Sequence, residues 1–507
     1  MVLDIQLAPV DFAVLIAYLA AVVAFGLWVG QGAKNLSDYL LGGRNLPWWA
    51  ILGSIVATET STVTFLSVPG IAYAEGGNLG FLQLALGYTI GRFIIVFVLL
   101  PLYFQGKIFS AYEILQTRFG QTTRKTASLL FLVTRNLGDG LRLYLTALVL
   151  REVIGLPLWL CIVVIGIATI IYTCIGGMKS VVWNDCVQFA AYILGGILAA
   201  WIVLQKLPNG WSEYISFAQE HQKLQLFDFQ YDLTNPHYIW AGLIGGAFLT
   251  LGTHGTDQMM VQRYLCARNQ RDAGWALILS GFTVALQFLL FLLIGIGLAA
   301  FYAGHPEITF AKNDRVFASF IVTQLPANVG IIGMVLAAVF SAAMSTLSSS
   351  LNSSASALVN DWFRANQSNN VDEDTKDNPS NMSLLRVTQW LTAIFGVLQI
   401  GIAIGVQEVE SVVGSALAIA GFSAGLLLGV FLLGILVQQA GQTSALAGLL
   451  CGTIVLVIVR FVLPGKVWLG YEWQLLAWPW FPVVGSVTTF TVGTLISLIF
   501  PIARIQK

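Results

Sequence analysis

The feature that most constrains this chain is a series of apolar stretches, each about 20 residues long or longer, that recurs from its beginning to its end. An α-helix needs about 20 apolar residues to cross the hydrocarbon core of a bilayer. Long runs rich in Gly and Ala favour helices over the ten-residue alternation of a membrane β-barrel. We therefore expect an all-α polytopic membrane protein.

About thirteen stretches have the length of a transmembrane helix. They fall near residues 9–31, 46–71, 79–106, 126–150, 155–176, 183–205, 237–263, 273–303, 328–363, 386–406, 410–437, 442–463 and 478–501. The first is not interpreted as a signal peptide, because MVLDIQLAPVD before it lacks Lys and Arg and its apolar run is too long. A mature N-terminus near residue 30 would contradict that interpretation.

The charge content supports the same class of protein. Only 10% of the residues are charged and 57% are hydrophobic, whereas an average soluble protein has about 25% charged residues. This excludes an ordinary soluble enzyme and a disordered chain. The net charge of zero leaves no basic field for nucleic acid. Four His residues and five scattered Cys residues offer no metal-binding spacing, so we expect the cysteines to pack as small hydrophobes.

The distribution of Lys and Arg predicts the orientation. Fifteen of the 25 lie after odd-numbered spans or at the C-terminus, with Arg263 counted in the loop after the seventh span, and seven lie on the opposite side. The positive-inside rule then puts the N-terminus outside and the C-terminus in the cytoplasm, in a multi-pass protein of the cell membrane. The polar, acidic residues 366–383 are interpreted as a disordered cytoplasmic connector.

The second span carries polar residues where the middle of the bilayer should lie. In GSIVATETSTVTFLSVPG (53–70), Thr58, Glu59, Thr60 and Ser61 stand together, and the segment ends at Pro69 and a glycine. Hydroxyl and carboxyl groups are costly in hydrocarbon, and β-branched residues are weak helix formers. This pattern predicts a broken helix.

The seventh span is interrupted in the same way. GGAFLTLGTHGTDQMMVQR (245–263) places Thr250, Thr253, His254 and Asp257 inside an apolar stretch. Interrupted helices at corresponding positions of two halves indicate the site of a secondary transporter. The alternative is that both segments are helix interfaces lined by small residues.

The spacing of the two interrupted spans predicts an internal repeat. Five spans separate their starts, so residues 46–206 and 237–437 would form two five-helix repeats, preceded by a helix at 9–31 and followed by two helices in 442–507. An odd number of helices in each repeat gives the two repeats opposite orientations in the membrane. We expect a five-plus-five inverted-repeat transporter core in a single membrane domain.

The ninth span presents a face of hydroxyl groups. Ser341, Ser345, Ser348 and Asn352 follow at helical spacing in AAVFSAAMSTLSSSLNSSASALVND (337–361). Neutral hydroxyl and carbonyl oxygens suit a weakly held Na⁺, and carbonyls freed by the break near residues 57–60 would complete its shell. Too few carboxylates converge for a tight Ca²⁺ site.

Charged residues inside spans are candidates for function. One face of the fourth span carries Arg135, Asp139 and Arg142. Asp139 would form an ion pair with either arginine that holds helices together; the alternative is that one arginine binds the carboxylate of a solute. Asp185, which begins the sixth span, is solvated at the interface or reaches the serine face of the ninth span. The candidate solute-binding residues are Thr58, Glu59, Ser61, Gln83, Asp139, Arg142, Thr250, Thr253, His254 and Asp257.

Several segments together resemble the sodium/solute symporter family, which includes sodium/glucose, monocarboxylate, iodide and sialic-acid cotransporters. The resemblance runs from about residue 10 to residue 437. The segments that carry it are SDYLLGGRNLPWWA (37–50), SAYEILQTRFG (110–120), YTCIGGMKSVVWNDCVQ (172–188), DQMMVQRYLCAR (257–268) and SSSLNSSAS (348–356). It implies a five-plus-five inverted repeat, sodium coupling and alternating access.

The resemblance also implies ligands for sodium. The main site would use backbone carbonyls of Ala57, Thr60 and Ala342 with the hydroxyls of Ser345 and Thr346, where the family usually has serine at the last position. A second site, present in some members, would use Asp185, Ser345, Ser348 and Ser349. Where sugar transporters of the family have an asparagine and an aromatic gate, this chain has Thr250 and Thr253, which argues against a glucose-type pocket.

The sequence thus favours a symporter that couples inward Na⁺ flow to uptake of a small polar solute, with Na⁺ as its coupling ion. Proton coupling through Glu59 or Asp185 is the close variant. An intramembrane hydrolase built on His254, Asp257 and a serine is disfavoured, because no HExxH or GxSxG motif is present. A sensor is disfavoured because FPIARIQK directly follows the last span, and a passive channel is a weaker alternative. The sequence indicates no obligate protein partner. It does not decide whether the solute is a sugar, a polyol or a carboxylate.

Overall fold

The structure, a computed structural model, describes residues 7–31, 35–106, 108–310, 312–364, 379–406, 412–468 and 471–501. Its helices are α1 (Pro9–Gly30), α2 (Leu36–Leu41), α3 (Trp48–Glu59), α4 (Thr62–Tyr73), α5 (Leu82–Ile94), α6 (Leu100–Tyr103), α7 (Glu113–Phe119), α8 (Gln121–Ile154), α9 (Leu158–Lys206), α10 (Trp211–Glu220), α11 (Gly246–Gly255), α12 (Gln258–Leu265), α13 (Gln270–Ala303), α14 (Val316–Gln324), α15 (Ile331–Leu358), α16 (Pro379–Gly405), α17 (Val412–Leu436), α18 (Gln442–Val457) and α19 (Trp480–Ile499). Two short antiparallel strands, β1 (Val467–Trp468) and β2 (Tyr471–Glu472), lie between α18 and α19.

The predicted helical membrane protein is confirmed, although the number of spans is not. Within the described residues, nine helices are long and apolar enough to cross a membrane, or up to ten if α3 and α4 form one bent span. The 49-residue α9 contains two of the predicted spans, which meet at Gly177, where φ is 58° and ψ is −157°. Only glycine adopts this conformation readily. The count of thirteen stays a prediction.

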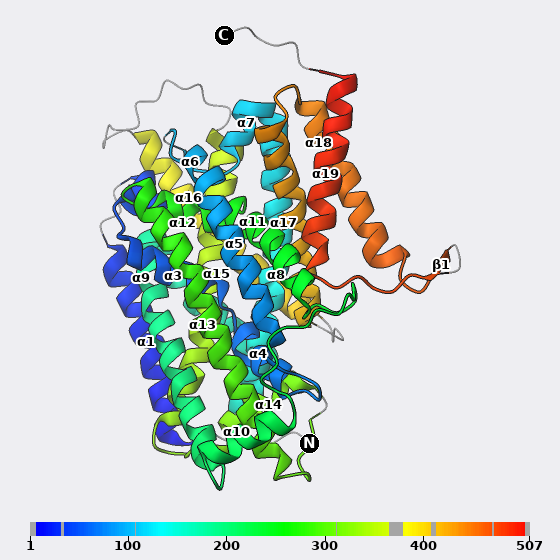
Figure 1. Cartoon of the computed structure of the whole chain (residues 1–507). Coiled ribbons are helices and arrows are strands. Elements are labelled where there is room, and N and C mark those ends of the chain that lie inside the picture. The colour runs from blue at the N-terminus through cyan, green and yellow to red at the C-terminus, as the bar shows by residue number, and fades with distance from the viewer. Residues whose placement is uncertain are drawn as a thin grey trace.

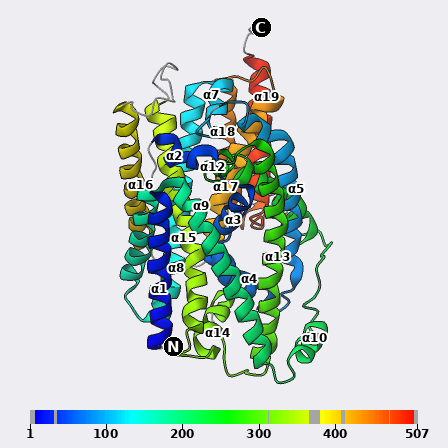
Figure 2. The same cartoon turned by 90° about the vertical axis from the view of Figure 1, so that its left-hand side faces the viewer.

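The long helices run side by side in one bundle (Figures 1 and 2). The start of α1 and the end of α19 lie at opposite ends of it, as an odd number of spans requires. Helices α18 and α19 stand on one side of the bundle and α1 on the other (Figure 1).

The interior of the bundle is built around α15. Every residue from Val335 to Ala357 is buried, including all the serines of the predicted hydroxyl face. The outer helices instead expose large apolar side chains, such as Leu194 on α9 and Trp390 on α16, which are 60% and 72% exposed. A polar interior with an apolar outer surface is the arrangement of a multi-pass membrane protein.

Both predicted helix breaks are present. The axes of α3 and α4 differ by 61°, and Thr60 and Ser61 between them have extended backbone angles. This joint between α3 and α4 is the first break. The second break lies in the seventh predicted span, where α11 ends at Gly255 and α12 begins at Gln258. These breaks open the two predicted repeats, whose boundaries stay a prediction. Most of the predicted acidic connector, residues 365–378, lies outside the described residues, and α16 begins at Pro379.

Close glycine packing holds α5 against the start of the seventh predicted span. A Cβ atom at Gly87 would lie 2.1 Å from the carbonyl oxygen of Gly242 and 2.8 Å from the amide nitrogen of Ala247. Backbone atoms cannot move aside as a flexible side chain can, so Gly87→Ala is expected to lower thermal stability by about 1–3 kcal/mol. Thermal unfolding of the detergent-solubilised protein measures this.

Gly401 on α16 supplies the matched control, because a Cβ there would meet no atom within 4 Å. Gly401→Ala should leave stability unchanged or raise it by up to about 1 kcal/mol, since alanine is the better helix former. Equal losses in the two variants would contradict the packing argument.

Candidate functional site

The break between α3 and α4 releases backbone carbonyls in the interior of the bundle. The N–H of Thr60 makes the last regular bond of α3, to the carbonyl oxygen of Val56 at 2.9 Å, and the N–H of Phe65 bonds to the carbonyl of Ser61 at 3.1 Å. The carbonyls from Ala57 to Thr60 therefore lie at a helix end, where no donor is supplied by the helix itself. Such carbonyls are available to a cation.

The hydroxyl face of α15 lies against this break. The Oγ1 atom of Thr346 is 3.1 Å from the carbonyl oxygen of Thr58 and 3.2 Å from that of Ala342. The main-site residues, defined as Ala57, Thr60, Ala342, Ser345 and Thr346, are all buried. They offer uncharged oxygen atoms, which suit a weakly held alkali cation; their role as sodium ligands stays a prediction.

Ser345 connects the break to the carboxylate of Asp185 on α9. Its hydroxyl donates to Oδ1 of Asp185 at 2.6 Å, so the lone pairs of the serine oxygen stay available. The hydroxyl of Ser54 on α3 donates to the other carboxylate oxygen at 2.5 Å. Asp185 therefore reaches the serine face of α15, one of the two alternatives that the sequence left open.

A buried arginine completes the surroundings of Asp185. Arg263 on α12 places Nη2 3.3 Å from Oδ2 of Asp185, and neither side chain is exposed. The same nitrogen donates to the hydroxyls of Thr58 and Ser349. The expectation that Arg263 lies in a loop is wrong, because the buried helix α12 continues past this residue to Leu265.

A second ion pair joins the two breaks. Arg92 on α5 donates to the carboxylate of Glu59, the last residue of α3. His254 near the end of α11 lies 3.4 Å from the same carboxylate oxygen and 3.2 Å from Nη2 of Arg92, and its Nδ1 is 3.0 Å from the hydroxyl of Thr253. Three predicted solute-binding residues thus meet around Arg92, whose partners the sequence did not indicate.

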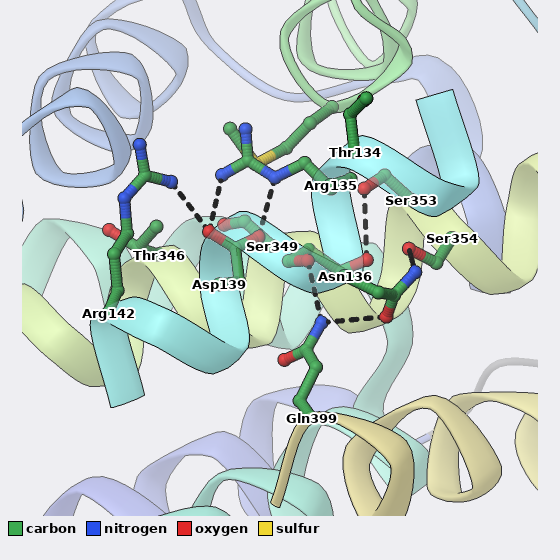
Figure 3. Close-up of polar contacts among 12 residues, drawn as sticks. Thr134, Arg135, Asn136, Asp139, Arg142, Thr346, Ser349, Ser353, Ser354 and Gln399 are labelled. Atoms are coloured by element: carbon green, nitrogen blue, oxygen red, sulfur yellow. Dashed lines mark hydrogen bonds and ion pairs between the residues drawn. The ribbon is translucent and has the colours of Figure 1, made fainter. Parts of the chain in front are cut away.

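The charged face of α8 forms a compact cluster (Figure 3). Arg135 makes two bonds to Asp139, at 2.6 and 2.9 Å, and Nη1 of Arg142 lies 2.6 Å from the same carboxylate. Asp139 is fully buried, whereas the Arg142 side chain is 21% exposed. The predicted internal ion pair is confirmed, and Arg142 uses only one of its nitrogen atoms in it.

A small cavity of about 30 Å³ lies beside this cluster. Arg135 and Arg142 of α8, Thr253 and Asp257 of the second break, and Ser423 of α17 are among its lining residues. Asp257 caps α12 by accepting the N–H of Met259 at 2.8 Å. The cavity has room for water but not for an organic molecule, which would fit only after the surrounding helices separate.

The other predicted solute-binding residues lie elsewhere. Gln83 uses its amide nitrogen for the carbonyls of Gly80 and His237, at 3.1 and 2.7 Å, and its amide oxygen accepts the N–H of Asp228 at 3.2 Å. Thr250 packs against Gly91, and Ser61 precedes α4. A contact that the sequence did not indicate is made by Gln287 of α13, whose amide donates to the Thr60 hydroxyl at 2.5 Å.

Comparison with protein families gives one match over most of the chain. The model of the sodium:solute symporter family matches residues 39–452. The sodium/sialic acid symporter SiaT of Proteus mirabilis (strain HI4320) is 29% identical over 98% of this chain and 96% of its own length. The human sodium-coupled monocarboxylate transporter 1 is 30% identical over 87% of this chain and 71% of its own length.

Solved structures give a matching fold. A substrate-bound, outward-open structure of a Na⁺-coupled sialic acid symporter superimposes with a TM-score of 0.85 at 29% identity, covering 98% of this chain and 99% of that one. The nucleobase-cation-symport-1 family transporter Mhp1 superimposes with a TM-score of 0.56 at 13% identity, covering 93% of this chain and 95% of its own. The second likeness shows the fold alone.

Proposed function

Because this chain belongs to the sodium:solute symporter family and is therefore a sodium-coupled membrane transporter, we propose that the solute it imports with Na⁺ is a small organic acid that also carries hydroxyl groups. The observation that carries this proposal is the arrangement of Arg142. Its guanidinium gives one nitrogen to Asp139 and lines the cavity between α8 and the second break. A planar guanidinium with donors to spare is suited to a carboxylate.

The rest of the cavity supports the hydroxyl groups of the proposed solute. Asp139 and Asp257 together balance the two arginines of the cavity, so the proposed solute carboxylate would bind through the unused guanidinium donors of Arg142 and not through an excess of positive charge. Thr253 and the carboxylate of Asp257 line the same cavity and offer acceptors for hydroxyl groups. This set matches an acid with several hydroxyls better than a neutral sugar.

The relatives support the same solute class. SiaT and the Aliivibrio fischeri protein NanT, which is 29% identical over 89% of this chain, are sodium/sialic acid symporters. Sialic acids are sugar acids, and monocarboxylates also carry one carboxylate. A carboxylate is the group that these solutes share and that Arg142 would bind.

Sodium is proposed to bind at the main-site residues. There it would tie the carbonyls of the first break to the hydroxyls of α15, and so order the joint between α3 and α4 before the solute arrives. An ordered joint raises the affinity for the solute, and by thermodynamic linkage the bound solute raises the affinity for Na⁺ equally. The coupling ion and the solute would therefore enter the closed state together.

Two ion pairs support sodium over proton coupling. Glu59 and Asp185, the carboxylates that were considered as proton carriers, each lie beside a buried arginine. Protonation of either carboxylate would leave a buried arginine without its counter-charge, which is costly where water is excluded, so we propose that neither group carries a proton through the transport cycle. Uptake driven by a pH gradient in sodium-free buffer would contradict this choice.

The proposed orientation puts the N-terminus outside and the C-terminus in the cytoplasm. With Arg263 inside the bundle, the distribution of loop Lys and Arg residues is still 14 against 7, so the positive-inside argument is unchanged. The proposed inward solute path then runs from the end of the bundle where α1 starts to the end where α19 finishes (Figure 1).

A thermal-shift screen of the purified protein tests the solute class. N-acetylneuraminate, pyruvate and glucose would each be added in Na⁺ buffer and in K⁺ buffer. A solute at 100 times its Kd should stabilise the protein by about 2.7 kcal/mol, and we expect this for a hydroxylated acid in Na⁺ only. Stabilisation by glucose but by neither acid would reject an acidic solute, and equal effects in K⁺ would reject sodium coupling.

A further inference from the structure

Helix α1, which lies outside the two predicted repeats, packs along α9 and α15 (Figure 2). Near its start, the buried carboxylate of Asp11 accepts the N–H of Asn328 at 2.6 Å and that of Gly333, in the first turn of α15, at 3.4 Å. A carboxylate at a helix N-terminus satisfies free N–H groups and is favoured by the helix dipole. A Cβ atom at Gly333 would lie 2.2 Å from the carbonyl oxygen of Asp11, so the starts of the two helices are in close contact.

About two turns further along, α1 contacts the hydroxyl face of α15. The hydroxyl of Tyr18 hydrogen-bonds to Oγ of Ser341. Ser341 gives its own proton to the carbonyl of Ala337 at 2.7 Å, so Tyr18 is the donor and Ser341 the acceptor. Ser341 directly precedes Ala342 and lies one turn before Ser345. The contact therefore falls on the turn of α15 that carries main-site residues.

The end of α1 is held by α9. A Cβ atom at Gly30 would lie 2.2 Å from Cα of Gly176, next to the kink at Gly177. The hydroxyl of Ser180 donates to the carbonyl of Gly26 at 2.8 Å. Membrane helices approach this closely through small residues. Tyr18 is thus presented to α15 by a helix that is fixed near both of its ends.

The position of α15 matters because the main-site residues come from two elements. Two of them belong to the first break and three to α15. A site binds its ligand well only when the binding atoms are held within about 0.5 Å of the required geometry. On the side toward the break, this turn of α15 is held by the bond from Thr346 to the carbonyl of Thr58. The bond from Tyr18 to Ser341 holds it from the side of α1.

We propose that α1 sets the position of α15 for sodium binding, and that Tyr18 is a positioning residue that acts through Ser341. The inference rests on the proposed function, because it takes the main-site residues as the place where Na⁺ binds. Tyr18 is not among the proposed ligands. It holds Ser341, and with it the carbonyl of Ala342 and the hydroxyl of Ser345, at the distance from the first break that the ion requires.

Titration of the purified protein with Na⁺ alone, replacing K⁺ at constant ionic strength, tests the proposal. The melting temperature in K⁺ measures the stability of the fold, and its increase with Na⁺ concentration gives the Kd for Na⁺. Tyr18→Phe should raise this Kd about 3- to 10-fold, because one hydrogen bond that supports the site is lost. A lower melting temperature in K⁺ with an unchanged Kd would show a merely structural contact and would overturn the inference.

A double-mutant cycle shows whether Tyr18 acts through Ser341. Ser341→Ala removes the same bond from the side of α15 and should raise the Kd for Na⁺ by a similar factor, and adding Tyr18→Phe to it should raise the Kd no further. Additive effects would overturn the inference. If Tyr18→Phe does not fold, Ser341→Ala decides the question alone, and a wild-type Kd in that variant would overturn the inference.

Tyr214→Phe is the matched control. It removes a buried tyrosine hydroxyl that donates to the carbonyl of Leu293 at 2.9 Å, between α10 and α13, and should leave the Kd for Na⁺ unchanged. A rise equal to that of Tyr18→Phe would show a general effect of losing such a hydroxyl and would overturn the inference. If Na⁺ does not stabilise the wild-type protein relative to K⁺, the proposed sodium site itself is wrong.

Discussion

Replacement of Ser345 and Thr346 together by alanine is expected to abolish the stimulation of uptake by Na⁺ while the protein stays folded. The change removes both side-chain oxygens that α15 offers to the proposed main site and leaves only the carbonyls of the break. Coupling between two ligands typically amounts to about 5- to 150-fold in affinity, and all of it should be lost. Solute uptake in Na⁺ and in K⁺ buffer measures the effect.

The folded state should tolerate this double change. Asp185 loses one donor, Ser345, but keeps Ser54 and Arg263. The carbonyl of Thr58 also loses the hydroxyl of Thr346. Each of these two lost hydrogen bonds costs about 1–3 kcal/mol, and the remaining partners of Asp185 should keep the variant folded. Gel filtration and thermal unfolding in detergent would confirm that the variant is intact before transport is measured.

Two variants serve as controls for the sodium prediction. Ser353 is equally buried on α15, but its hydroxyl donates to Ser350 of its own helix, so Ser353→Ala should keep full stimulation. Thr346→Ser preserves a hydroxyl at the proposed site and should also keep it. Undiminished sodium stimulation in the double alanine variant would reject these ligands.

The helices and their breaks could be predicted because their signals are local. Apolar runs mark the membrane helices, and the clusters at Thr58–Ser61 and Thr253–Asp257 interrupt them with hydroxyl and charged groups within a few residues. Both breaks stand where those clusters lie. The number of spans was harder, because α9 runs through two predicted spans with a kink at Gly177.

The partners of the buried charges could not be predicted in the same way. Arg92 and Glu59 are separated by 33 residues, and Arg263 and Asp185 by 78, so each pairing depends on how distant helices pack. The Arg135, Asp139 and Arg142 cluster was foreseen because all three residues lie on one helix. Gln83 shows the opposite case: its residue type fits a solute site, yet its amide contacts the 228–237 loop.

The cavity beside Arg142 explains why the solute site is harder to define than the sodium site. At about 30 Å³ it is too small for an organic solute, so we expect the proposed solute contacts to form only when α8, α17 and the second break move relative to one another. The proposed sodium ligands instead come from the first break and α15, which already touch through Thr346 and Thr58. A test of the solute site must therefore measure transport as well as binding.

The second large effect is expected for Arg142→Gln, which should lower the apparent affinity for the acidic solute by about 10- to 100-fold. The change removes a charged hydrogen bond to the carboxylate, which contributes about 1.5–3 kcal/mol. The fold should survive, because Arg135 keeps both of its bonds to Asp139. Concentration-dependent uptake of the solute in Na⁺ buffer measures the change.

Comparison of the acid with its neutral amide separates recognition of charge from damage to the site. Wild-type protein should prefer the acid, whereas Arg142→Gln should transport acid and amide with similar affinity, because the glutamine side chain has no charge to discriminate between them. Arg151→Gln, at an exposed arginine on the same helix, should keep the wild-type preference. If Arg142→Gln still preferred the acid by the wild-type factor, another cation would have to bind the carboxylate, and the proposed role of Arg142 would be wrong.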